Sequence, residues 1–489
     1  IVPKRAKWCV LLGASAVYYV MAAGLRTLWL VAAILIVYGG GLLLGHLNER
    51  GKARRKAAAD KEEKKQIRKK YDAKKRAVVT VAVLGVFGLL IALKYVNFLG
   101  ESAYGIAGLF GSKSAYQPVQ ILLPLGISYY TLCAVSYVVD VYRGKYKPER
   151  NFFKLALFLS FFPQMTEGPI GKYEIMMPRL VEGHSFDFER DAQAVMRIFW
   201  GMFKKMVIAD RANLFVTGVF DNGDQAGSMV LLGTLLYTVQ IYCEFSGCMD
   251  IVCATGQLFG VEMQENFRRP IFSKTINEFW QRWHITLGAW IKEYVFFSVS
   301  LSKGLMNLSK HTRKKLNDYF ANLVPMTFAL FCVWFFNGIW HGASWKYVLY
   351  GLYYYILMMI GMYLRPVSDK LLHALHIAPE SKGFALFQMV RTFLIVNVGM
   401  MLFRCHTIIQ FGQSLARIFT DFDGACLTNG TGLSLGNDWQ DFLLMGIGAA
   451  REGPHHSLGA GSPSGGAAVC GVLGADYRRD RLWRLRYRL

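Results

Sequence analysis

The sequence predicts an all-α, multi-pass integral membrane protein with about ten membrane-embedded helices, each near the ~20 residues that cross a bilayer. Three observations support this class. Hydrophobic residues make up 53% of the chain, long apolar runs recur along it, and basic residues gather between the runs. We expect some membrane segments to be broken, re-entrant or interfacial, because irregular backbone is tolerated at membrane depth only inside protein or along a cavity.

The expected spans follow from the apolar runs in chain order. The clearest runs cover residues 8–24, 27–46, 77–95, 118–139, 228–243, 321–339, 344–364 and 388–404. Shorter or interrupted runs lie near 152–165, 192–209 and 286–300.

The strongly basic balance is interpreted as a topology signal. The chain carries 56 Lys and Arg against 33 Asp and Glu, a net charge of +23. In a soluble protein this excess would suggest a nucleic-acid partner. Here the basic residues lie between hydrophobic runs, where Lys and Arg set the orientation of the spans. We therefore expect no nucleic-acid partner.

Three segments fix the predicted topology. Segment 47–76 holds 14 Lys and Arg against 5 Asp and Glu, and is expected to be helical and cytoplasmic. It suits either contact with anionic membrane lipid or a solvated helix, and both readings stay open. Segment 303–315 is also basic and is expected inside, whereas 407–441 has four Asp against one Arg and is expected outside. The short turn 340–344 then lies towards the outer side, or deeper in the membrane.

The nine cysteines give no sign of a metal site or a disulfide framework. Most lie in apolar runs, where Cys behaves as a small hydrophobe. Cys243, Cys248 and Cys253 are five residues apart and form no CxxC pair, so we expect no metal.

The first unusual polar segment is FFPQMTEGPI, residues 161–170. Pro163, Gly168 and Pro169 do not suit a regular helix. Gln164 and Glu167 lie beside them in an apolar context, which is typical of a broken, re-entrant segment. An ordinary interfacial turn is the alternative interpretation.

The second polar segment, residues 264–297, mixes aromatic and charged side chains, as at a membrane interface. Ser273 or Thr275 is expected to cap a helix that carries Glu278, Gln281, Arg282 and His284. Glu278 and Arg282 are four residues apart and should pair. Gln281 and His284 should share one face of the helix. A hydrogen-bonded structural role is the alternative for His284.

The third segment, NGIWHGAS, covers residues 337–344 and joins two long apolar runs. His341 has no carboxylate near it in sequence, and Gly338 and Gly342 leave room for close approach of backbone or ligand. A neutral imidazole is a good general base near pH 7. A buried structural histidine is the alternative interpretation.

Six ordered stretches resemble the membrane-bound O-acyltransferase superfamily, in the branch of the alginate O-acetyltransferase membrane subunit and the teichoic-acid D-alanyl transfer protein. They are LPLGISYYTLCAVSYVVDVYRGK (123–145), FFPQMTEGPI (161–170), GMFKKMVIADR (201–211), YTVQIYCEFSGCMDI (237–251), ENFRRPIFSKTINEFWQRWHITLGAWIKEYVF (265–296) and NGIWHGASWKYVLYGLYYY (337–355). The stretch EFSGCMD departs from the usual DFSGYSD, which puts the subfamily in doubt.

The resemblance implies that His341 and His284 match the two family histidines and that a funnel runs through the protein. The implied activity moves an acyl group, most simply acetyl, from a cytoplasmic thioester such as acetyl-CoA towards hydroxyls of a cell-surface polysaccharide. His341 would act as general base. His284, with Gln281 or Asn277, would orient groups or stabilise an oxyanion. Asn337 and Trp340 would shape the pocket wall, and Gln164 and Glu167 are supporting residues.

The same resemblance implies no bound cofactor, an SGNH-type extracytoplasmic partner and a place in the bacterial cell membrane. D-alanyl transfer to teichoic acid is the rival within the class. A polar-glycan transporter or flippase is the rival from another class, because broken helices and buried polar groups occur there too. A transporter should contain two related halves, and none is visible in the sequence.

The expected organisation has four parts. They are spans with the basic segment in 1–96, the catalytic core in 97–365, further spans in 366–449, and an aberrant Gly-, Ser- and Arg-rich tail in 450–489. The chain starts with Ile, so a missing start is expected, and the tail suggests a frameshift near residue 450. A natural disordered basic tail is the alternative.

Overall fold

The computed structural model describes residues 2–223 and 225–451, and the secondary structure of this part of the chain is helical, without a β-strand. The all-α prediction is therefore confirmed. The chain up to Met445 forms one compact unit. Its α-helices are α1 (Lys7–Ala23), α2 (Thr27–Ala57), α3 (Lys61–Leu90), α4 (Val96–Leu109), α5 (Ile127–Arg143), α6 (Phe152–Ser160), α7 (Phe162–Met165), α8 (Tyr173–Glu182), α9 (Phe188–Met202), α10 (Asp210–Phe220), α11 (Gly227–Leu258), α12 (Ile276–Arg282), α13 (Ile285–Ile291), α14 (Phe297–Ser300), α15 (Lys303–Thr312), α16 (Asp318–His341), α17 (Trp345–Tyr363), α18 (Arg365–Ala374), α19 (Lys382–Arg404), α20 (Ile408–Thr420) and α21 (Trp439–Arg451).

Shorter helical turns join or interrupt these elements. Three are π-helical: η3 (Ile91–Tyr95), η4 (Phe203–Ala209) and η6 (Lys292–Phe296). Five are 3₁₀ turns: η1 (Lys4–Ala6), η2 (Gly24–Arg26), η5 (Pro270–Phe272), η7 (Gly424–Leu427) and η8 (Leu433–Leu435). Single π turns inside longer helices often mark functional sites, and η3 becomes important below.

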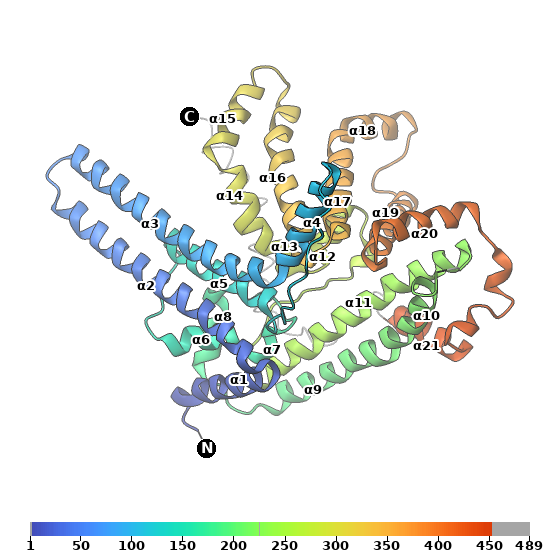
Figure 1. Cartoon of the computed structure of the whole chain (residues 1–489), viewed down its shortest axis with the longest axis horizontal. Helices are drawn as coiled ribbons and strands as arrows, with labels where there is room; N and C mark the ends of the chain where they lie inside the picture. Colours follow the sequence, from blue (N-terminus) through green and yellow to red (C-terminus); the bar gives the residue numbers. More distant parts are fainter. Residues whose placement is uncertain (1, 224, 452–489) are drawn as a thin grey trace. The chain divides into compact units, whose positions relative to one another are not determined.

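The helices α2 and α3 lie side by side as a long antiparallel pair (Figure 1). Both continue beyond their apolar parts into the basic segment 47–76, which is helical as predicted except for a short break. Asp60 ends that break, because its carboxylate accepts a hydrogen bond from the backbone N–H of Glu63 and caps α3.

The span expected over 118–139 begins later than predicted. Residues 112–124 are not helical, and α5 starts only at Ile127. Pro118 and Pro124 interrupt the run because proline lacks the backbone N–H that a helix interior needs. Gly126 follows with φ 67°, a left-handed conformation that glycine adopts at little cost. Apolar composition alone concealed this break.

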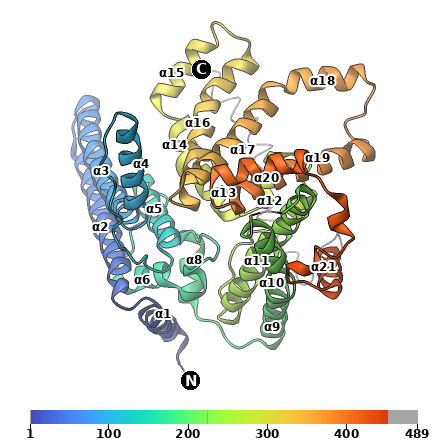
Figure 2. The ribbon, with the colours of Figure 1, turned by 45° about the vertical axis from the view of Figure 1, so that its right-hand side comes forward.

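The run expected near 192–209 is part of a longer helical segment. The elements α9, η4 and α10 follow one another and lie alongside α11 (Figure 2). The helix α11 extends well beyond the predicted 228–243 and forms the other half of this pair. Two charged residues of this segment, Arg197 and Lys204, pair with Asp250 of α11.

The helices α16 and α17 form the hairpin that carries the turn 340–344. Gly338 lets them approach closely: a side chain there would collide with the backbone oxygen of Tyr347, and Gly351 faces Gly338 from α17. The expectation of close approach at Gly338 is confirmed, with protein backbone as the neighbour.

Five helices in the described residues are long and apolar enough to cross a membrane, or six if the bent pair α17 and α18 counts as one span. The five are Lys4–Ala57, Lys61–Leu109, Gly227–Leu258, Asp318–His341 and Lys382–Arg404. The predicted number of about ten is not confirmed. Residues 452–489, and with them the predicted aberrant tail, lie outside the described part of the chain.

Candidate active site

His284 and His341 both contact one aromatic ring, that of Trp340. The ring centroids of His284 and Trp340 are 5.7 Å apart, and those of His341 and Trp340 are 5.1 Å apart. The two histidines come from different elements, and the fold brings both of them to Trp340. They form one candidate site, which we call the two-histidine site.

His341 is the last residue of α16 and sits among aromatic side chains. Its ring contacts Tyr350 from α17 at 5.8 Å and Phe403 from α19 at 5.3 Å, both edge to face. The described residues provide no hydrogen bond to either imidazole nitrogen of His341. This imidazole is held by ring packing and keeps both nitrogens available for chemistry.

His284 is buried between α12 and α13, with 3% of its surface exposed. Its backbone is left-handed, with φ 47°, which is unusual for a residue other than glycine. Two backbone hydrogen bonds hold the turn against the preceding segment: Arg268 N–H to the Arg282 oxygen and Ile285 N–H to the Asn266 oxygen. Strained backbone of this kind persists where the surroundings over-determine it, often at functional sites.

Asn266 fixes the orientation of the His284 ring. Its side-chain oxygen accepts hydrogen bonds from the Thr286 backbone N–H at 2.9 Å and the Thr286 hydroxyl at 2.7 Å. The same oxygen lies 3.4 Å from His284 Nδ1. The Thr286 backbone N–H can only donate, so the Asn266 atom that it contacts must be the amide oxygen. An amide oxygen can only accept, so Nδ1 of His284 carries the proton. Nε2 is then a proton acceptor in the neutral ring.

The Nε2 atom of His284 is buried and has no hydrogen-bond partner among the described residues. Buried polar atoms are nearly always satisfied, so an exception needs an explanation. A substrate group that donates to Nε2 is one such explanation. In this tautomer neutral His284 offers an acceptor at Nε2, which suits the expected orienting role better than stabilisation of an oxyanion.

The segment 161–170 is broken, as predicted. The helices α6 and α7 are followed by a non-helical stretch before α8. The backbone N–H of Ile170 donates to the Thr286 hydroxyl at 3.0 Å, which links this stretch to His284 through Asn266. The broken segment therefore supports the two-histidine site from outside it.

Gln164 and Glu167 lie in different surroundings. Gln164 is buried, its amide nitrogen donates to the sulfur of Cys133 at 3.4 Å, and its amide oxygen has no protein partner among the described residues. A cavity of about 10 Å³ beside it has room for one water molecule. Glu167 is exposed, and neither residue contacts a histidine.

The helix expected to carry Gln281 and His284 on one face ends before it reaches His284. The helix α12 stops at Arg282, and the left-handed turn at His284 starts a new direction. Gln281 and Asn277 are both exposed, so no helical face brings them to the histidine. The predicted cap by Thr275 and the Glu278–Arg282 pair, at 2.5 Å, are confirmed.

Asn337 and Trp340 are buried, at 5% and 7% exposure. The indole N–H of Trp340 donates to the backbone oxygen of Ser128, in the first turn of α5, at 3.3 Å. Tyr129 adds an edge-to-face contact to the indole, with centroids 5.6 Å apart. Trp340 is thus fixed from α5 and contacts both histidines. The role of Asn337 in a pocket wall remains a prediction.

Two residues near the site escaped the sequence analysis, Asn266 and Lys94. Asn266 lies in the ENFRRP stretch with no signal in spacing or composition that tied it to His284. Lys94 lies on the π turn η3, and its ammonium group donates to the backbone oxygen of Trp340. A lone lysine in an apolar run was the one available signal for Lys94.

A second group of charged residues joins α9 and η4 to α11. Arg197 binds Glu265 with two nitrogens, at 2.7 and 2.8 Å, and also donates to Asp250 at 2.9 Å. Lys204, almost fully buried, meets Asp250 at 2.5 Å and the Ser246 hydroxyl at 3.1 Å. We call these four charged residues the α9–α11 ion cluster. It contains two cations and two carboxylates, so its charges balance.

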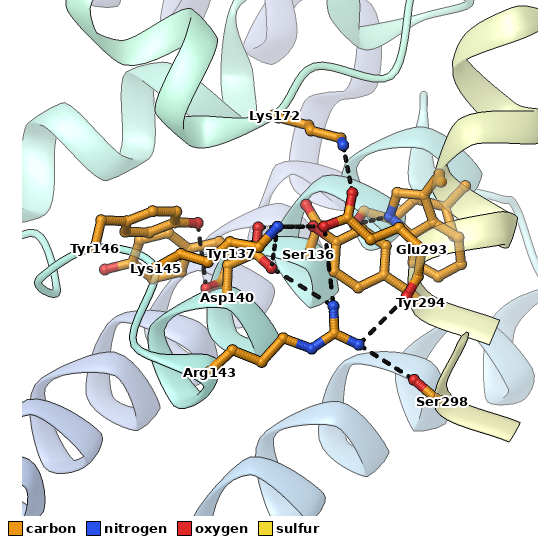
Figure 3. A network of polar contacts seen from close by, with 12 residues as sticks. Ser136, Tyr137, Asp140, Arg143, Lys145, Tyr146, Lys172, Glu293, Tyr294 and Ser298 are labelled. Atoms are coloured by element: carbon orange, nitrogen blue, oxygen red, sulfur yellow. Dashed lines mark hydrogen bonds and ion pairs between the residues drawn. The ribbon is translucent and has the colours of Figure 1, made fainter. Parts of the chain in front are cut away.

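A third polar network joins the end of α5 to η6 and the segment before α8 (Figure 3). Asp140 is 2% exposed and accepts from the Tyr294 hydroxyl at 2.7 Å and pairs with Lys145 at 3.2 Å. Glu293 pairs with both Lys145 and Lys172. Oppositely charged partners thus lie side by side in this network also.

Comparison with known proteins identifies the family to which these features correspond. Residues 149–312 match the model of the MBOAT, membrane-bound O-acyltransferase family. The matched segment contains His284 and Asn266, while His341 and Lys94 lie outside it.

Three similar proteins illustrate the range of relatives. A probable alginate O-acetylase of Azotobacter vinelandii is 30% identical over 343 residues, 70% of this chain and 62% of the relative. The peptidoglycan O-acetyltransferase of Helicobacter pylori is 29% identical, over 59% of this chain and 56% of the relative. The teichoic acid D-alanyltransferase of Bacillus subtilis is 26% identical, over 59% and 70%.

The alignment with the alginate O-acetylase thus spans about six tenths of that relative's length. The match of residues 149–312 to this family's model and the long apolar helices together indicate a membrane protein. Residues 149–312 therefore form a domain of the membrane-bound O-acyltransferase family, and the chain is homologous to bacterial acetyl- and D-alanyltransferases.

Proposed function

We propose that this protein is a membrane O-acyltransferase that moves an acetyl group from a thioester towards a hydroxyl of a cell-surface polysaccharide. The observation that carries the proposal is the meeting of His284 and His341 at Trp340, with one buried imidazole nitrogen left without a partner. Similarity to an alginate O-acetylase and a peptidoglycan O-acetyltransferase supports acetyl as the group and a glycan as the acceptor.

The chemical step requires a base because a hydroxyl is a weak nucleophile. His341 takes the hydroxyl proton while the oxygen attacks the thioester carbonyl, so an O–H bond breaks and a C–O bond forms. Collapse of the tetrahedral intermediate breaks the C–S bond, and His341 returns the proton to the sulfur. General acid–base help of this kind is typically worth ~10²–10⁴ in rate.

His284 has a different part in this proposal. Its Nδ1 faces Asn266, so only Nε2 is turned towards a substrate, and only as an acceptor. It holds an O–H or N–H of the substrate by accepting its hydrogen bond. Orientation alone contributes strongly to rate, because reacting atoms must lie close and aligned.

The donor and partners follow from the acetyl proposal. Acetyl-CoA, or another acyl thioester, approaches from the cytoplasmic face of the bacterial cell membrane, and the protein needs no bound cofactor. An SGNH-type extracytoplasmic protein completes transfer to the polysaccharide, and membrane lipid surrounds the apolar helices.

D-alanyl transfer to teichoic acid is the second candidate function. The similarity to the teichoic acid D-alanyltransferase of Bacillus subtilis favours it. The same two-histidine chemistry serves either acyl group, because a thioester is attacked by a hydroxyl in both cases.

Membranes from cells that make the full chain together with its SGNH-type partner test both candidates. They are supplied in parallel with radiolabelled acetyl-CoA and with a radiolabelled D-alanyl carrier-protein thioester, and label in the cell-surface glycan is counted. We expect acetyl incorporation that His341→Ala lowers at least a hundredfold, within the range of general base catalysis. His46→Ala, a change at an exposed histidine on α2, is the matched control and should keep full activity. Incorporation of D-alanine alone would replace the first candidate by the second, and equal incorporation by His341→Ala would contradict both.

A further inference from the structure

Lys94 lies next to the two-histidine site, on the π turn η3. This turn interrupts the apolar helical segment Lys61–Leu109. The lysine is half-buried, and its Nζ donates to the backbone oxygen of Trp340 at 2.7 Å and to the hydroxyl of Ser128 at 3.2 Å. Because Trp340 directly precedes His341, the hydrogen bond to its backbone oxygen places the ammonium group at the end of α16 that carries His341.

Both hydrogen-bond partners of Lys94 are neutral. In the described part of the chain, the ion pairs do not include Lys94, although its Nζ also lies 5.5 Å from the ring of Tyr95. An ionisable side chain in an apolar span is costly, and such residues usually have a function. The arrangement differs from the α9–α11 ion cluster, where the cations meet carboxylates.

Capping the helix explains only part of this arrangement. The last four backbone carbonyls of α16 have no partner within the helix, and the carbonyl of Trp340 is one of these four. The next residue on η3, Tyr95, serves the neighbouring carbonyl: its hydroxyl donates to the Ile339 oxygen at 2.7 Å. A neutral hydroxyl therefore suffices to satisfy a carbonyl at this helix end. The positive charge of Lys94 goes beyond what capping requires.

We propose that Lys94 is a positioning residue of the two-histidine site, which fixes the end of α16 and holds an ammonium group at the residue before His341. This inference rests on the proposed acyltransfer. Negative charge develops on the carbonyl oxygen and then on the departing sulfur during that reaction. A positive charge held at a fixed position stabilises such charge without reorganisation. The hydrogen bond to the Trp340 oxygen keeps the charge, Trp340 and His341 in one geometry.

Four variants separate the charge from the hydrogen bond. Lys94→Met removes both, Lys94→Gln keeps a donor but removes the charge, and Lys94→Arg keeps charge and donors. Tyr95→Phe is the matched control, because it removes the adjacent hydrogen bond to the same helix end without changing charge. Membranes with equal amounts of full-length protein are given acetyl-CoA and glycan acceptor, and His341-dependent release of the CoA thiol is followed over a range of acetyl-CoA concentrations.

We expect kcat to fall about tenfold or more in Lys94→Met and Lys94→Gln, because an electrostatic group acts mainly on the transition state, while KM for acetyl-CoA changes little. Lys94→Arg should recover most of kcat, and Tyr95→Phe should stay within about threefold, the scale of one neutral hydrogen bond. If Lys94→Met is lost from the membrane, Lys94→Gln carries the test.

The possible results distinguish the Lys94 proposal from the proposed acyltransfer on which it rests. Wild-type kcat in Lys94→Gln, or equal losses in Lys94→Gln and Tyr95→Phe, would overturn the Lys94 proposal while the acyltransfer stands. Absence of any His341-dependent thiol release would overturn the acyltransfer and the Lys94 inference with it.

Discussion

The α9–α11 ion cluster and the two-histidine site both place polar groups inside an apolar protein, but they treat those groups differently. In the ion cluster, Arg197 and Lys204 both pair with Asp250. Arg197 also donates two hydrogen bonds to Glu265. At the two-histidine site, Nε2 of His284 has no partner in the described residues, and Lys94 donates only to neutral groups. The cluster satisfies its charges within the protein, whereas the site keeps groups available.

This difference teaches that burial of a charged residue is not by itself a sign of function. Removing charges from water is expensive, and oppositely charged partners with good hydrogen bonds offset the cost. The ion cluster meets that requirement and joins two helical segments. An unpartnered buried atom has no such compensation in the protein alone, so a ligand or water must supply it. At Gln164 a neighbouring cavity has room for one water, which offers a simple explanation there.

The largest effect on stability is expected at the ion cluster. Asp250→Ala removes the carboxylate that both cations share and leaves Lys204 buried without it. Breaking a buried pair by removing one partner typically costs about 3 kcal/mol or more. The heat-denaturation midpoint of the detergent-purified protein measures this loss, and acyl transfer per folded molecule should change little.

Asp369→Ala is the control for the ion cluster. Asp369 pairs with Arg365 at 3.9 Å on α18, and both side chains are exposed, so the pair should contribute little to stability. Equal midpoints for Asp250→Ala and Asp369→Ala would show that the buried cluster does not stabilise the protein as described here.

A smaller effect, on activity, is expected at Asn266. Asn266→Ala removes the acceptor that sets the tautomer of His284, and loss of a residue that orients an active-site group commonly costs about tenfold to a hundredfold. Asn266→Asp retains an oxygen acceptor and should recover part of the activity. Acetyl transfer is measured at equal protein amounts. Full activity of Asn266→Ala would show that the orientation of His284 by Asn266 does not matter for transfer.

The sequence predicted the long apolar helices and singled out both histidines, because long apolar runs and unusual polar residues are local signals. The prediction failed where a single backbone turn changed the direction of the chain. The helical pattern predicted that Gln281 and His284 share one face of a helix. The backbone at His284 is left-handed, with φ 47°, so the helix does not continue to that residue. Pro124 and Gly126 similarly shortened the span expected over 118–139.

Asn266 and Lys94 could not be assigned to the site from sequence. Their relevance depends on contacts with residues distant in the chain: Lys94 lies 246 positions from Trp340. Asn266 acts through Thr286 and His284, beyond the turn that the helical pattern missed. The tertiary arrangement was needed to place either one.

The central claim, that His284 and His341 act as one unit around Trp340, is tested most directly by combining their alanine variants. Acetyl incorporation is measured for His284→Ala, His341→Ala and the double variant at equal amounts of inserted protein. Residues that act as a unit are strongly non-additive. We predict that each single variant loses about a hundredfold or more, and that the double variant is no worse than the more damaged single one within a few-fold. Losses that multiply in the double variant, or near-normal incorporation by either single variant, would contradict the two-histidine site.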